Sequence, residues 1–237
     1  MRILFLVFTS TFLFSTQTNA QFGNLLDKAK SVLSDEGDLD ISGGLKQALE
    51  VGVEDAVASL SQEDGYLESP YKILIPAEAR SIVSTVSKVP GFTNVETDLI
   101  NKMNEAAELA ARKAGPIFFQ AIKQMTIADA TDILMGNQDA ATRYLERTSR
   151  NSLYQEFMPV IQTALDEVNA RSLWTSAVDA YNKIPFQKKL NPDLDDHVNG
   201  AALDGLFSLV EKKEEGIRND VGLRTTPLLK DVFARQD

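Results

Sequence analysis

A short run near the carboxyl end, "NPDLDDHVNG" from Asn191 to Gly200, gathers residue types that bind metal ions. It holds three aspartates and the single histidine of the chain. On a helix that begins near Pro192, Asp196 lies three residues after Asp193 and His197 lies four residues after Asp193. The three side chains then share one face and offer oxygen and imidazole ligands. They form the candidate site for a divalent metal.

The same run also fits an ordinary helix start. Asn191 is a favoured N-cap residue, and acids in the first turn meet free backbone amides and the positive end of the helix dipole. Under this interpretation no cofactor is expected, and the metal is the alternative. A second acidic run, "SDEGDLD" at 34–40, is either a weak calcium site or a solvated loop.

An apolar stripe in "GPIFFQAIKQM" is a candidate lining for a ligand cavity. Phe118 and Met125 fall on one helical face with other apolar residues, and Phe119 adds a second aromatic ring beside them. We therefore take Phe118, Phe119 and Met125 as candidate ligand-binding residues. The alternative is that the stripe is ordinary hydrophobic core.

A basic ridge follows in "GNQDAATRYLERTS". Arg143, Arg147 and Arg150 lie at spacings of four and three, with Tyr144 beside them, on a protein that is acidic as a whole. Such a ridge could receive a carboxylate or phosphate of a ligand or partner. The alternative is pairing with acids of the same segment.

Motifs of known enzymes are missing from the sequence. There is no cysteine, so thiolate metal sites, cysteine nucleophiles and disulfides are excluded. We find no nucleophile elbow, phosphate-binding glycine loop or dinucleotide fingerprint, and one histidine cannot form a paired-histidine zinc helix. The sequence favours a protein that is not an enzyme, with carboxylate catalysis in a cleft as an alternative.

The first twenty residues have the layout of a signal peptide. Arg2 precedes an apolar run, and Thr18 and Ala20 supply the small residues of a cleavage site before Gln21. Cleavage removes Arg2 alone among the charged residues, and leaves 23 basic and 34 acidic residues with a net charge of −11. We expect an exported protein, periplasmic or extracellular, that has no transmembrane helix when mature and binds no nucleic acid.

Helical periodicity runs through the rest of the chain. Apolar residues recur three and four apart from 22 to 34, from 45 to 60 and in most later segments. We predict an all-α protein with about nine or ten mostly short helices and no substantial sheet. An amphipathic helix and a flexible acidic loop occupy 21–44, and one compact domain occupies 45–237.

Several local features refine this fold. "EDGYLESPYKILIP" predicts a turn and an extended stretch, because proline biases the preceding residue away from helix. Thr93 with Glu96, and the run "TIAD" at 126–129, predict helix N-caps. Separate helices are predicted at 139–147 and 153–168, the second kinked at Pro159.

Four ordered motifs resemble the bacterial domain of unknown function 4197 family. They are "GLKQALEVGVEDAV" at 44–57, "DGYLESPYKILIP" after it, the stretch from "MNEAAELAARKAGPIFF" to "RYLERTS" at 103–149, and "LDDHVNGAALDGLFSLVEKKEEGIRND" at 194–220. The resemblance implies an exported, mainly helical protein and supplies no catalytic residues.

The features together favour a non-catalytic binding protein. Its partner is expected to be an envelope protein or a small apolar or amphipathic ligand held between helices. The alternatives are an envelope-directed hydrolase that uses carboxylates in a cleft, and a divalent-metal-binding module at Asp193, Asp196 and His197.

Overall fold

The computed structural model describes residues 42–88, 93–167, 169–183, 185–186, 189–191, 193–224, 230 and 232–234. All of them lie in one compact unit, Asp40–Asp237, which is distinct from the unit Met1–Leu39. The predicted signal peptide, the helix at 22–34 and the acidic run at 34–40 lie outside the described residues. No helix within the described ranges combines the length and the apolar character that a membrane span needs.

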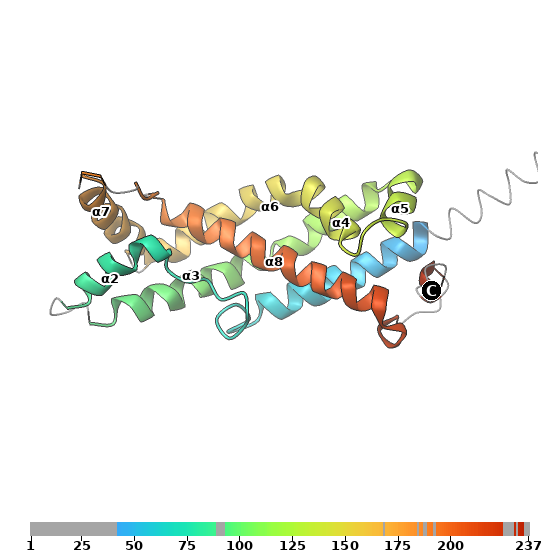
Figure 1. Ribbon diagram of the computed structural model, residues 1–237, viewed down its shortest axis with the longest axis horizontal. Coiled ribbons are helices and arrows are strands. Elements are labelled where there is room, and N and C mark those ends of the chain that lie inside the picture. Colours follow the sequence, from blue (N-terminus) through green and yellow to red (C-terminus); the bar gives the residue numbers. More distant parts are fainter. Residues whose placement is uncertain are drawn as a thin grey trace, which may run out of the picture. The chain divides into compact units, whose positions relative to one another are not determined.

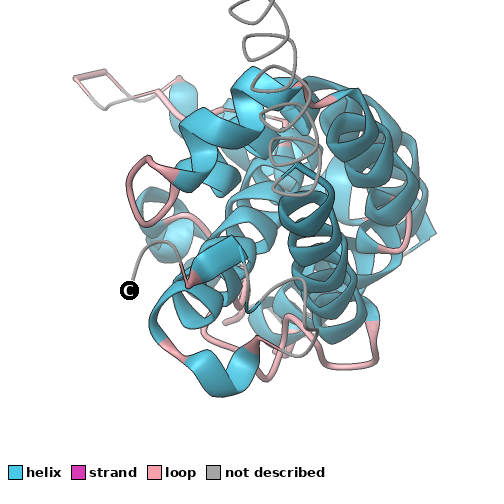
Figure 2. Ribbon diagram, turned by 90° about the vertical axis from the view of Figure 1, so that its right-hand side faces the viewer, coloured by secondary structure: helices cyan, strands magenta, loops and turns pink. Residues whose placement is uncertain are grey.

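Every regular element of the described residues is helical, which confirms the all-α class (Figures 1 and 2). The described chain begins with a helix at 42–61. The later elements are η1 (Ala77–Ala79), α2 (Arg80–Val86), α3 (Val95–Ala111), α4 (Ala114–Gln124), α5 (Ile127–Leu134), α6 (Ala140–Glu167), α7 (Ala170–Asn182), α8 (Leu194–Asn219) and η2 (Val221–Leu223). The described part therefore holds eight α-helices, fewer than the nine or ten predicted.

One cause of this difference is α6, a single helix where the sequence predicts two. The polar run between the two predicted segments remains helical because its hydroxyls are satisfied within the helix. Thr148 donates to the carbonyl of Tyr144 at 2.8 Å, and the buried Ser149 donates to that of Leu145 at 2.5 Å. The helix also continues through Pro159, where a kink is predicted.

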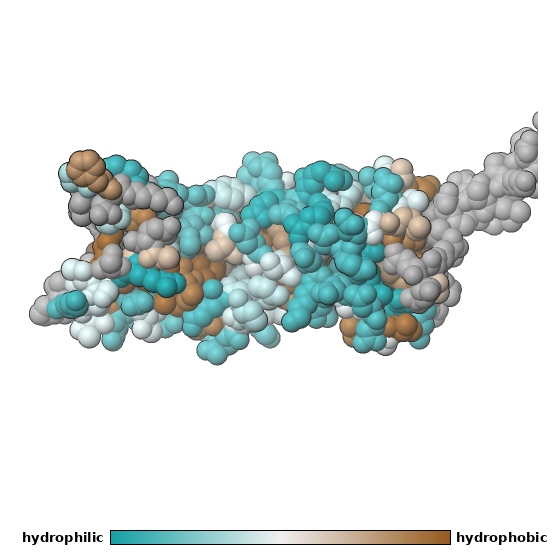
Figure 3. Space-filling view, viewed as in Figure 1, coloured by the Kyte–Doolittle hydropathy of each residue, from teal (hydrophilic) through white to brown (hydrophobic). Residues whose placement is uncertain are grey.

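The core forms where α6 packs against α8 and α3. The alanines of α3 at 106, 107, 110 and 111 are fully buried, and their short side chains let neighbouring helices approach closely. Phe118 of α4 and Phe207 of α8 meet edge to face with their ring centroids 5.6 Å apart. The outward face of α8 is largely hydrophilic in Figure 3.

Two polar side chains of α3 hold the extended stretch that follows the 42–61 helix. The Asn104 amide accepts from the backbone N–H of Ile73 at 2.8 Å and donates to its carbonyl at 2.9 Å, much as a neighbouring strand would. One turn later, Glu108 accepts from the N–H groups of Tyr66 and Leu67. No strand forms among the described residues here, and an amide and a carboxylate satisfy the buried backbone instead.

The other side of this stretch rests on α8. The hydroxyl of the fully buried Tyr66 donates to the carbonyl of Ala202 at 2.8 Å. A Cβ atom at Gly205 would lie 3.0 Å from the Cβ of Tyr71 and 3.1 Å from the Tyr66 ring. Glycine at 205 therefore lets the stretch pack directly on α8.

The two predicted N-caps have different outcomes. Thr126 and Asp129 form a reciprocal capping box at the start of α5, which confirms the prediction. The capping box predicted for Thr93 and Glu96 is wrong. The N-cap of α3 is Asn94, its side chain makes no cap hydrogen bond, and Thr93 stands one residue before it.

Glu108 makes stability depend on pH. Burial raises its pKa more than the hydrogen bonds from the Tyr66 and Leu67 backbone lower it. A raised folded-state pKa gives stability that is present below the unfolded value, about 4.3, and lost as pH rises through the folded value. Glu108→Gln keeps an oxygen acceptor and cannot ionise, so we expect its stability relative to the wild type to increase with pH over that window.

Urea unfolding at several pH values measures this effect. Glu105→Gln, one turn away and exposed, is the matched control. Identical pH dependence in the two variants and the wild type would contradict the role given to Glu108.

Candidate functional site

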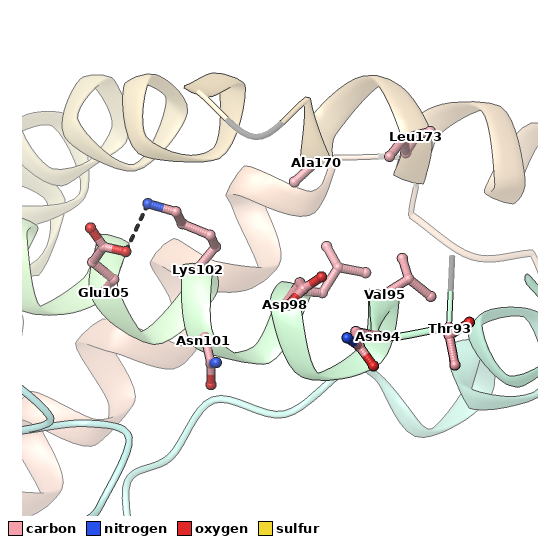
Figure 4. Close-up of a pocket in the computed structure, with 10 residues that line it drawn as sticks. Thr93, Asn94, Val95, Asp98, Asn101, Lys102, Glu105, Ala170 and Leu173 are labelled. Carbon is pink, nitrogen blue, oxygen red and sulfur yellow. Dashed lines mark ion pairs between the residues drawn. The ribbon is translucent and has the colours of Figure 1, made fainter. Parts of the chain in front are cut away.

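A groove lies between the first half of α3 and the start of α7 (Figure 4). Its volume is about 590 Å³. The described residues that line it are Thr93, Asn94, Val95, Asp98, Leu99, Asn101, Lys102, Glu105, Ala170 and Leu173. This volume is within the range of small-molecule sites, about 300–1,000 Å³.

Two neighbouring stripes of α3 build one wall of the groove. Val95, Leu99 and Lys102, at spacings of four and three, form a mainly apolar stripe, and Val95 and Leu99 pack partly on the core. The polar stripe beside it is Asn94, Asp98, Asn101 and Glu105. One wall of the groove therefore offers an apolar surface with a polar edge.

The opposite wall is apolar and comes from α7. Ala170 is buried, whereas 41% of Leu173 is exposed. In Figure 4 both residues lie on the helix that faces α3, across from Val95 and Lys102. A large apolar side chain left exposed beside a cavity can gain burial when a ligand enters.

Hydrogen bonds to residues around the start of α8 hold α7 in place. Arg171 bonds Asp195 of α8 at 3.3 Å and Asp166 of α6 at 2.8 Å. The Trp174 indole N–H donates to the carbonyl of Asn191 at 3.3 Å. The run "NPDLDDHVNG" thereby positions the wall that carries Leu173.

Asp195 and Asp196 of this run also accept hydrogen bonds from side chains of α6, and Asp196 accepts one from Asn191. Asp196 accepts from the Tyr154 hydroxyl at 2.5 Å and from the Asn191 amide at 3.1 Å. The bond to Asp196, with burial added, raises the pKa of Tyr154 to about 12. Asp195 also accepts from Gln162 of α6 at 2.6 Å.

The structure does not assemble the three candidate metal ligands into one site. His197 Nε2 lies 3.0 Å from the carbonyl oxygen of Leu74, and Asp196 is bound to Tyr154. Nowhere in the described ranges do three histidines or acids form a group that could hold a metal ion. Asp193 itself stands at the N-cap of α8 without a side-chain cap bond.

Asn191 is not the N-cap predicted for this helix. It stands two residues before the N-cap, Asp193, and its side-chain oxygen accepts from the Asp193 N–H at 3.0 Å. This is a local turn that leads into α8 rather than a helix cap.

The basic ridge divides into two parts on the structure. Arg143 pairs with Asp139, Glu146 and Glu211, and Arg150 pairs with Glu146 and Asp204. Arg147 instead lies over the Tyr144 ring, 5.6 Å from its centroid. Arg143 and Arg150 are therefore both paired with acids, and two of these acids, Asp139 and Glu146, belong to the same segment of the chain.

The apolar stripe of α4 is likewise mostly enclosed. Phe118 and Met125 are buried, while 39% of Phe119 is exposed. Phe118 packs on Phe207, as described above. None of the three lines the α3–α7 groove.

Sequence reasoning did not identify the groove residues as a site. From the sequence alone, Asp98, Leu99 and Leu173 have no predicted role in a site. The polar spacing at 94, 98, 101 and 105 is visible in the sequence, but its opposition to α7 requires the fold.

Comparison of the sequence with known protein families identifies one match. A family model described as "Protein of unknown function (DUF4197)" matches residues 35–234. No curated protein and no solved structure matches the chain.

Proposed function

Because the chain belongs to the DUF4197 family, whose description assigns no activity, we propose its function from its own geometry. The protein binds a small apolar or amphipathic molecule in the α3–α7 groove and catalyses no reaction there. The observation that carries this proposal is the exposed side chain of Leu173 opposite the apolar stripe of α3.

The groove has the composition of a binding site for such a molecule. Val95, Leu99 and Leu173 offer apolar surface on both walls, and the polar stripe lies along one edge. Burying apolar surface supplies most of the affinity for a ligand of this kind, while a few polar groups fix its orientation. An amphipathic molecule satisfies both parts at once.

The proposal places this binding outside the cytoplasm. The apolar run after Arg2 and the small residues before Gln21 support export by a signal peptide. In the cell envelope, apolar and amphipathic molecules must cross water between membranes, and a soluble carrier or sensor would shield them from it.

The arrangement of acids favours binding over hydrolysis. A carboxylate mechanism needs two acids facing each other across the substrate. Both acids among the described lining residues, Asp98 and Glu105, lie on α3, and Glu105 is paired with Lys102 at 2.8 Å. The described residues that α7 contributes to the lining are an alanine and a leucine.

Leu173→Asp tests the proposal. A charge on the apolar wall should weaken binding of an environment-sensitive apolar dye, such as Nile red, about tenfold or more, since burying a leucine stabilises by about 1.5–3 kcal/mol. Leu173 is partly exposed, so the fold should persist, and circular dichroism checks this. Fluorescence titration of the mature protein measures the affinity.

Leu74→Asp is the matched control, because Leu74 is similarly exposed, at 46%, and does not line the groove. It should leave dye affinity unchanged. Equal affinity for Leu173→Asp and the wild type would place any dye binding elsewhere and overturn the proposal.

A further inference from the structure

The charges along the α3–α7 groove identify the class of ligand. We infer that the groove selects amphipathic molecules with a positively charged head group, an ammonium or guanidinium, which Asp98 receives. This inference rests on the proposed function, because it assumes that the groove holds an apolar chain.

The first step is the charge balance of the lining. Lys102 is the single cation among the described lining residues, and its ammonium pairs with Glu105 at 2.8 Å. That pair neutralises both groups. Asp98 has no hydrogen bond or ion pair to its carboxylate from any described residue, so one negative charge remains on the edge of the groove.

The second step is the surroundings of this carboxylate. Asn94 lies one turn before Asp98 and Asn101 one turn after it, on the same polar stripe. Both are neutral amides whose oxygens can accept hydrogen bonds from an ammonium or guanidinium. The stripe thus presents one charged acceptor between two neutral ones.

The third step is the position of Asp98 beside the apolar stripe. It precedes Leu99 by one residue, about 100° around the helix, so its carboxylate lies at the edge of the surface that Leu99 and Val95 form. A ligand chain in contact with Leu99 and Leu173 would bring its head group to this edge. The wall that α3 contributes from Val95 to Glu105 is about 15 Å long by the helical rise, enough for an extended alkyl chain.

An anionic head group fits the same groove poorly. It would meet the carboxylate of Asp98. Lys102, the single cation among the described residues of the lining, is bound to Glu105, and only 24% of its side chain is exposed. The net charge of the whole chain, −10, also attracts cations and repels anions over longer distances.

Three dodecyl probes that differ in head group test the inference: dodecylammonium, dodecyl maltoside and dodecanoate, all kept below their micelle concentrations. Each is titrated against the Nile red complex of the mature protein. We expect dodecylammonium to bind about two- to fivefold tighter than the neutral probe, the scale of an exposed ion pair, and dodecanoate to bind weakest. Added salt should reduce these differences.

Asp98→Asn separates the head-group site from general charge effects. It should remove most of the preference for dodecylammonium over the neutral probe and leave the affinity for the neutral probe unchanged. Asp132→Asn, an exposed acid of α5 outside the groove lining, removes the same charge and should keep the preference.

The outcomes distinguish the two proposals. Equal affinities for all three probes, or a preference that survives Asp98→Asn, would overturn the cationic head group and leave the apolar groove standing. Binding that is unaffected by Leu173→Asp, or no binding of any probe, would overturn both.

Discussion

Glu214→Ala should lower the free energy of unfolding by about 3–5 kcal/mol, the range seen when one partner of a buried ion pair is removed. The Glu214 carboxylate reaches from α8 to the first turn of α6. It accepts from the N–H groups of Ala141 at 3.0 Å and Thr142 at 2.8 Å, and from the Thr142 hydroxyl. Alanine would leave these buried donors without an acceptor.

The same change would remove the carboxylate that pairs with Arg218. This guanidinium is buried, pairs with Glu214 at 2.9 Å, and donates to the carbonyls of Ile133 and Leu134 at the end of α5. Without the carboxylate, this buried positive charge would lose its ion pair. We call Glu214 and Arg218 together the α8 clamp, because they hold the end of α5 and the start of α6.

Urea unfolding of the wild type and of Glu214→Ala measures the loss in the free energy of unfolding. Glu215→Ala is the matched control, because Glu215 is the next residue of the same helix and is exposed, so its removal should change stability by no more than about 0.5 kcal/mol. Glu214→Gln should lose an amount of stability between those of Glu214→Ala and Glu215→Ala, because glutamine keeps an acceptor and loses the charge. A loss for Glu214→Ala as small as that for Glu215→Ala would contradict the clamp.

Asn104→Ala should cost about 2–4 kcal/mol, from about 1–3 kcal/mol for each buried group left without a partner. The Asn104 amide serves both the N–H and the carbonyl of Ile73, and its nitrogen also donates to the carbonyl of Ile100 at 2.7 Å. Ile73 is buried, so water cannot replace these bonds without opening the stretch that lies on α3.

Asn101→Ala, on the exposed side of the same helix, controls for helix propensity and should be nearly silent. Hydrogen exchange of the Ile73 amide adds a local measurement. Its protection should fall in Asn104→Ala and persist in Asn101→Ala. Unchanged protection in Asn104→Ala would show that this side chain does not hold the stretch.

The parts of the fold that sequence predicts well are governed by local rules. Apolar spacing predicts the helix at 42–61, α3 and α8, and the run at 126–129 predicts an N-cap, which the structure contains in the form of a capping box. The prediction of helix ends fails where another interaction outweighs the local residue preference. The polar residues around Ser149 suggest a break in α6, but their hydroxyls bond backbone carbonyls of the same helix.

The buried polar ties are beyond local prediction. Glu214 lies 72 residues from Thr142, and Asn104 lies 31 from Ile73. In the sequence, Glu214 is one of thirty-four acids, with nothing in its neighbours to separate it from the exposed Glu215. Only the packing of α8 against α6 decides which of the two is buried.

The candidate site shows the same limit. Asp196 and His197 attract attention because of their residue types, yet the structure engages them with Tyr154 and the Leu74 carbonyl. Leu173 and Asp98 are ordinary residues of amphipathic helices. They become a site because α3 and α7 leave about 590 Å³ between them, and that spacing is a property of the tertiary structure.

The α8 clamp has a consequence for the order of events during synthesis. The ribosome releases α5 and α6 well before Glu214 and Arg218 emerge. The turn between those two helices therefore forms before the side chains that hold it are present. The hydrogen bond from the Tyr66 hydroxyl to the Ala202 carbonyl likewise cannot form until α8 has been synthesised. Contacts of such long sequence separation delay cooperative closure until the last long helix arrives. A chain built this way stays open during synthesis and becomes compact after its carboxyl-terminal part has emerged.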